Sequence, residues 1–89
     1  MDDVIFSSEE FAHACGVSIT WVQEHVDAGV LHVETGSAQW RFASPDVVRA
    51  RRIVHLETTF DADPQLAALT ADLIEEVNEL RKRLQLLER

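Results

Sequence analysis

The stretch that decides the fold is Ser7-Ser8-Glu9-Glu10-Phe11-Ala12-His13-Ala14-Cys15-Gly16-Val17-Ser18, followed by Ile19-Thr20-Trp21-Val22-Gln23-Glu24-His25-Val26-Asp27-Ala28-Gly29. Ser7, with Glu10 three residues later, is a capping box and predicts a short helix directly after it. Gly16 supplies the left-handed position that ends this helix, and Ser18 caps a second helix that ends at Gly29. Two short helices joined by a turn that contains glycine form the helix-turn-helix pattern.

After Gly29 the hydrophobic period changes from that of a helix to that of a strand. Leu31 and Val33, and later Trp40 and Phe42, alternate with polar residues. The intervening Thr35-Gly36-Ser37 is typical of a turn, so we predict a small β-hairpin, or wing. Trp40 is expected to pack on the helices from this wing.

Two further helices are predicted beyond the wing. Ser44 as cap, with Pro45 at the first helical position, opens a third helix. Asp61-Ala62-Asp63-Pro64 then breaks the chain, with Asp63 and Pro64 suited to be the cap and first residue of a last helix. The expected architecture is mainly α: a winged helix-turn-helix domain over residues 1–62 and a long C-terminal helix over residues 63–89.

The last helix carries a stripe of apolar side chains at coiled-coil spacing. Its members follow one another after three or four residues and are Leu66, Leu69, Leu73, Val77, Leu80, Leu84 and Leu87, with one local stutter between Leu73 and Val77. At 1.5 Å per residue the helix is about 35–40 Å long, more than a core of this size covers. We therefore expect its first turns to fold back on the domain and the stripe from Leu69 to Leu87 to form the seam of a homodimeric coiled coil.

Charge is distributed unevenly along the chain, whose formal net charge is -8. Up to Trp40 there is no Lys or Arg, but there are seven carboxylates: Asp2, Asp3, Glu9, Glu10, Glu24, Asp27 and Glu34. Because DNA affinity depends on Lys and Arg displacing condensed counterions, this composition argues against binding DNA through the second helix. It favours a basic protein partner, with Glu9, Trp21, Glu24, Asp27 and Glu34 as the candidate binding residues. The alternative is a solvated face that only keeps the protein soluble.

Several classes of function are disfavoured by composition. The single cysteine, Cys15, cannot form an intrachain disulfide and is expected to be a small core residue. The four histidines have no metal-ligand spacing, and no nucleophile elbow, phosphate-binding glycine loop or paired-carboxylate cleft is recognisable. We therefore expect no enzyme activity, no catalytic residues, no metal and no cofactor. No run of about 20 apolar residues and no basic signal region occur, so we expect a cytoplasmic protein.

The order of several short motifs resembles the winged helix-turn-helix of the MerR family. They are Gly16-Val17-Ser18, Gly29-Val30-Leu31 and Trp40-Arg41-Phe42. The chain is more closely similar to the CbpM type of MerR-like protein. That resemblance covers nearly the whole chain and adds the following motifs: Glu10-Phe11, Arg51-Arg52-Ile53-Val54-His55-Leu56, Asp72-Leu73-Ile74-Glu75-Glu76 and Leu80-Arg81-Lys82-Arg83-Leu84.

This resemblance implies a chaperone modulator that binds the J-domain of a DnaJ-like (CbpA-type) co-chaperone and inhibits its action on DnaK. J-domains carry a basic helix, which an acidic protein can occupy by charge complementarity. The resemblance also implies a homodimer with an antiparallel coiled coil, as in MerR relatives.

Two other functions stay open on the sequence. One is a MerR-type DNA-binding transcription regulator, whose phosphate contacts would be Arg41, Arg49, Arg51 and Arg52. The other is an adaptor that pairs with a different protein through Leu69 to Leu87. Only the DNA-binding regulator is expected to recognise a palindromic promoter site, and only the adaptor is expected to show no self-association.

Overall fold

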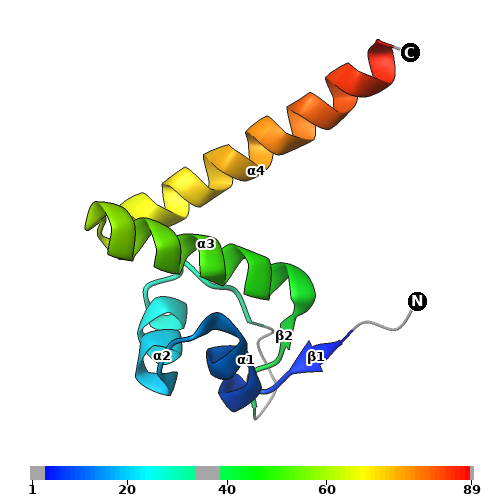
Figure 1. Ribbon diagram of the computed structural model, residues 1–89. Coiled ribbons are helices and arrows are strands. Elements are labelled where there is room, and N and C mark those ends of the chain that lie inside the picture. The colour runs from blue at the N-terminus through cyan, green and yellow to red at the C-terminus, as the bar shows by residue number, and fades with distance from the viewer. Residues whose placement is uncertain (1–3, 34–38, 89) are drawn as a thin grey trace.

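The helices observed in the structure follow the order expected from the sequence. The computed structural model describes residues 4–33 and 39–88. Its elements are β1 (Ile5–Phe6), α1 (Ser8–Cys15), α2 (Ile19–Asp27), β2 (Phe42–Ala43), α3 (Ser44–Phe60) and α4 (Pro64–Leu87). Figure 1 shows α1 and α2 beneath α3, with α4 leaving the end of α3 as a long rod. The predicted mainly α architecture with a long C-terminal helix is confirmed.

The caps that define α1 and α2 are formed as predicted. The backbone N–H of Ser7 donates to Glu10 Oε1 (2.9 Å), and the backbone N–H of Glu10 donates to Ser7 Oγ (3.2 Å). The bond from the Ser7 N–H lowers the pKa of the Glu10 carboxyl. Gly16 follows α1 with φ 71°, a left-handed conformation that glycine adopts without strain. Ser18 Oγ then accepts from the backbone N–H of Trp21 (3.0 Å) and starts α2.

The strand after the wing has a different partner from the one predicted. Phe42 pairs with Phe6, and Ala43 with Ile5, in an antiparallel two-stranded sheet. Among the described residues, 31–33 form no strand, so the predicted hairpin pairing of 31–33 with 40–42 was wrong. The expected turn at residues 35–37 lies outside the described residues.

The physical reason for this pairing lies at the end of α2. The backbone N–H groups of Val30 and Leu31 both donate to the carbonyl of His25, at 3.0 and 3.3 Å. These two hydrogen bonds extend the C-terminal cap of α2. They also occupy backbone N–H groups that would otherwise be available to pair with a neighbouring strand. Phe42 is buried and stacks on Phe11 with ring centroids 3.9 Å apart, which brings β2 to the start of the chain.

The third helix begins one residue earlier than predicted. Ala43, rather than Ser44, is the N-cap, because the carboxylate of Asp46 accepts from the backbone N–H of Ala43 at 2.8 Å. The cap of the last helix is as predicted: Asp63 Oδ1 accepts from the N–H of Leu66 at 2.8 Å, and Pro64 is the first helical residue.

The hydrophobic core includes the first turns of α4. Its largest fully buried side chains are Phe11, Val22, Phe42 and Ile53, and Cys15 is buried beside them, as predicted. Burial raises the pKa of the Cys15 thiol. The contribution of α4 is a stripe of small residues, Ala67, Ala68 and Ala71, all within the same core cluster. Small side chains let α4 approach closely, so its N-terminal part folds back on the domain as expected.

The outer part of α4 projects away from the rest of the molecule (Figure 1). From Asp72 to Glu88 every side chain except that of Ile74 is exposed. Across residues 4–33 and 39–88, no helix is both long and apolar enough to cross a membrane.

Candidate functional site

The candidate acidic surface consists of Glu24 and Asp27 on α2, and a third predicted binding carboxylate, Glu9, lies on α1. All three side chains are exposed. Glu24 and Asp27 are three residues apart and therefore lie on one face of α2. Within the described part of the chain, none of the three forms an ion pair with a basic residue. Glu34, the fourth predicted carboxylate, lies outside the described residues.

Trp21 lies partly in the core and is engaged by neighbouring side chains. Its indole Nε1–H donates to Glu57 Oε1 at 3.1 Å. Its ring stacks on that of His25 with centroids 3.6 Å apart and planes 17° from parallel. The indole is therefore half-buried beside the acidic surface, and its polar atom is already used by α3.

His25 joins α2 to α3 through an interaction that was not predicted from the sequence. The side chain is buried, with Nδ1 2.7 Å from the carbonyl oxygen of Trp21 and Nε2 2.6 Å from Glu57 Oε2. Because both ring nitrogens face oxygen atoms, a ring that carries both protons donates to each. The available sequence signal was that His25 lies three residues after the buried Val22, on the inward face of α2. Nothing local pointed to Glu57, which is 32 positions away.

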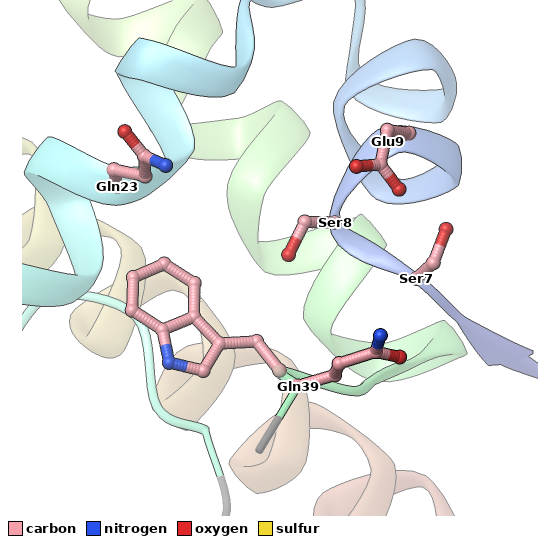
Figure 2. Close-up of a pocket in the computed structure, with 6 residues that line it drawn as sticks. Ser7, Ser8, Glu9, Gln23 and Gln39 are labelled. Atoms are coloured by element: carbon pink, nitrogen blue, oxygen red, sulfur yellow. The ribbon is translucent and has the colours of Figure 1, made fainter.

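A cleft opens beside Glu9, between the start of α1, α2 and the segment that leads to β2. It has a volume of about 280 Å³ and is lined by Ser7, Ser8, Glu9, Gln23, Gln39 and Trp40. Figure 2 shows Ser8 and Glu9 on one wall and Gln23, projecting from α2, on the other. Trp40 is half-buried and packs against the core, as predicted. Glu9 was predicted from the sequence as a binding residue, whereas the cleft was not predicted.

The four arginines proposed as alternative phosphate contacts do not share one environment. Arg49 is only 15% exposed, and its guanidinium donates to the carbonyl of Val30 (3.2 Å) and pairs with Asp72 (2.6 Å) and Glu75 (3.6 Å). It therefore ties α3 to α4 and to the end of α2. The other three differ in exposure: the side chains of Arg41 and Arg51 are exposed, and that of Arg52 is half-buried.

The predicted dimer seam lies on the free side of α4. Leu69, Leu73, Val77, Leu80, Leu84 and Leu87 are between 45% and 81% exposed. Leu73 follows the buried Ala71 by two residues, or about 200° around a helix of 3.6 residues per turn, so leucines and alanines occupy opposite faces. Spacings of four and three residues alternate from Leu73 to Leu87, which is a heptad pattern, and the predicted stutter is the pair of successive four-residue spacings that joins Leu69, Leu73 and Val77. The pairing of this seam with a second chain stays a prediction.

Taken together, the two capped helices, the short sheet and the long α4 define a helix-turn-helix protein whose second helix presents carboxylates. The family profile of MerR HTH family regulatory proteins matches residues 6–89, which is nearly the whole chain. The chain therefore belongs to the MerR HTH family of regulatory proteins, whose members are generally regulators rather than enzymes. A comparison with curated proteins finds no match.

Proposed function

We propose that this MerR-family chain is a chaperone modulator that binds the J-domain of a DnaJ-like (CbpA-type) co-chaperone and inhibits its action on DnaK. The observation that carries the proposal is the acidic surface. Glu24 and Asp27 stand exposed on the helix that a DNA-binding relative would insert into the major groove, and no Lys or Arg occurs before Arg41. Such a helix repels phosphate and attracts a basic protein.

Electrostatic complementarity gives the proposed complex a recognisable signature. Charges at the rim of an interface mainly increase the association rate and make binding dependent on salt. Raising the ionic strength from 0.01 to 0.15 M shortens the Debye length from about 30 Å to about 8 Å, which screens exposed pairs. Binding through the acidic surface is therefore expected to weaken markedly over that range.

The test is a calorimetric titration of the full chain with the J-domain of a DnaJ-like protein from the same genome at two salt concentrations. Reversal of both carboxylates, Glu24→Lys with Asp27→Lys, is expected to weaken binding by about tenfold or more, since each exposed pair contributes up to about 1 kcal/mol and is replaced by repulsion. The thermal midpoint should not fall. Unchanged affinity in this variant would remove the acidic surface from the interface.

A matched control is available on α4. Glu76→Lys with Glu88→Lys makes the same change in net charge at two other exposed positions. This variant is expected to bind the J-domain much as the wild type does. An equal loss of affinity in both variants would mean that only net charge matters and that no particular surface is recognised.

A MerR-type DNA-binding regulator is the second candidate, favoured by the family itself. Of its four predicted phosphate contacts, Arg41 and Arg51 are the exposed ones. Two arginines neutralise few phosphates, so DNA binding through these contacts alone should depend only weakly on salt. A mobility-shift screen against promoter fragments from the same genome tests this candidate. Specific binding that survives Glu24→Lys and disappears in Arg41→Ala with Arg51→Ala would favour it.

We further propose that α4 forms a coiled coil with the same helix of a second copy. The exposed seam of α4 is the feature that supports this pairing. At about 25 cal/mol per Å² of buried apolar surface, covering a stripe of this length contributes several kcal/mol to association.

A further inference from the structure

The cleft at the start of α1 has features that a flat acidic surface lacks. It combines one exposed carboxylate, Glu9, with the half-buried ring of Trp40 and with hydroxyl and amide groups contributed by α1, α2 and the segment before β2. Figure 2 shows the side chains of Ser8, Glu9 and Gln23 arranged around one hollow. Three separate segments therefore contribute to a single concave site.

The side chains that line the cleft favour a guanidinium or ammonium group carried on an apolar stem. Glu9 supplies a negative charge that has no ion-pair partner among the described residues, and the indole of Trp40 supplies an aromatic surface. Carboxylates and aromatic faces are the two groups that bind guanidinium and ammonium ions best. The hydroxyl of Ser8 and the amide oxygen of Gln23 are further acceptors for N–H donors.

An anion is the competing occupant, because the cleft lies at the N-terminus of a helix. The helix dipole amounts to about half a positive charge there. The first turn of α1 already holds two carboxylates, Glu9 and Glu10, and no Lys or Arg precedes Arg41 in the sequence. The local charge is therefore negative and favours a cation.

The size of the cleft sets the kind of ligand. A volume of about 280 Å³ is slightly below the roughly 300–1,000 Å³ of typical small-molecule sites. It suits one long side chain better than a complete cofactor. We propose that this cleft receives a single arginine or lysine side chain from the protein partner, with Glu9 as the counter-ion and Trp40 as the stacking surface.

This inference rests on the function proposed above, because it gives the basic partner a defined point of attachment. It adds a second contact point to the proposed interface, separate from the acidic surface, because Glu24 and Asp27 do not line the cleft. A partner anchored here has one basic residue in the cleft and other basic residues facing α2. The cleft then sets the register of the complex and the acidic surface strengthens it.

The test uses the full chain, labelled with ¹⁵N, and two probes of the same shape. N-acetylargininamide carries the guanidinium, and N-acetylcitrullinamide replaces it with an uncharged urea group. We expect the arginine probe to give saturable shifts of the Trp40 indole N–H and the Gln23 side-chain amide, and the citrulline probe to give none. Equal shifts with both probes, or shifts spread over all acidic residues, would overturn the proposal.

Glu9→Gln and the control Glu76→Gln each remove one exposed carboxylate. Glu9→Gln is expected to raise the dissociation constant of the arginine probe about two- to fivefold, whereas Glu76→Gln leaves it unchanged. An unchanged constant in Glu9→Gln would contradict the assignment of the counter-ion.

The same two variants, titrated with the J-domain, separate this proposal from the proposed function. If the wild type takes up the arginine probe as described but binds no J-domain, the cleft stands and the proposed partner is wrong. If the wild type binds the J-domain and Glu9→Gln binds both the J-domain and the probe unchanged, the partner stands and the cleft proposal is wrong.

Discussion

Replacing Glu57 by alanine should strongly destabilise the protein, although this residue lies on none of the candidate binding surfaces. Its two carboxylate oxygens serve different partners: Oε1 accepts from the indole N–H of Trp21 at 3.1 Å, and Oε2 lies 2.6 Å from Nε2 of His25. The side chains of His25 and Glu57 are only 7% and 16% exposed. Water therefore replaces the lost partner poorly at the histidine.

The magnitude follows from the two groups that lose a partner. A buried polar group without a hydrogen bond costs about 1–3 kcal/mol, so the variant should lose about 2–4 kcal/mol, with the half-buried indole contributing less. Total stabilities of small domains are about 5–15 kcal/mol, which makes this a large fraction. At about 4–8 °C per kcal/mol for a chain of this size, the thermal midpoint should fall by about 8 °C or more.

Thermal unfolding followed by far-ultraviolet circular dichroism measures this change, and Glu76→Ala on the exposed part of α4 is the control. The control should stay within about 0.5 kcal/mol of the wild type. A double variant, His25→Phe with Glu57→Leu, replaces both members of the shortest contact by apolar groups and should recover part of the loss. A Glu57→Ala variant that melts together with the control would refute the conclusion that this cluster holds α2 against α3.

Three further predictions concern a helix cap, the core and the proposed seam of α4. The hydrogen bond from the Ser7 N–H lowers the pKa of the Glu10 carboxyl in the folded protein. The ionised carboxylate therefore stabilises the fold at a pH above the ordinary pKa of glutamate, and this stabilisation is lost as the pH falls through the lowered pKa. Urea titrations should therefore show the wild type more stable than Glu10→Gln at neutral pH, with the difference closing in acid. Burial raises the pKa of Cys15, so iodoacetamide should modify it slowly in the native protein and rapidly in urea; equal rates would contradict its burial. Leu80→Asp with Leu84→Asp should abolish self-association in sedimentation, and a variant that still sediments as a dimer would exclude the proposed seam.

Most features that depend on residues close together in the sequence could be predicted, the exception being the cap of α3, which was expected at Ser44 and is formed at Ala43. The capping box of Ser7 and Glu10, the Ser18 cap and the Asp63 cap each join residues three positions apart, and all were correct. The burial of Cys15 also followed from its apolar neighbours. Such features are fixed by local geometry and need no knowledge of the tertiary fold.

Features that join distant segments could not be predicted in the same way. The predicted partner of β2 was wrong because a strand of two residues has too short a hydrophobic pattern to distinguish Ile5–Phe6 from residues 31–33 as its neighbour. Arg49 was considered as a phosphate contact, but it pairs with Asp72, 23 positions away. For the candidate site, the exposure of Glu24 and Asp27 followed from helix periodicity, whereas the cleft beside Glu9 depends on three segments meeting.

The way in which α4 is attached to the domain makes its outer part a rigid spacer of fixed length and direction. The alanines of its first turns are buried against α3, and Arg49 clamps the helix at Asp72, so the base of α4 has little freedom to swivel. Beyond that clamp the helix runs without interruption to Leu87, about 23 Å further on at 1.5 Å per residue. Any molecule held at the far end of α4 is therefore kept at a set distance and angle from whatever is bound beside α1 and α2. Inserting residues into the outer half of α4 would lengthen the helix by about 1.5 Å and rotate its C-terminal end by about 100° for each residue added.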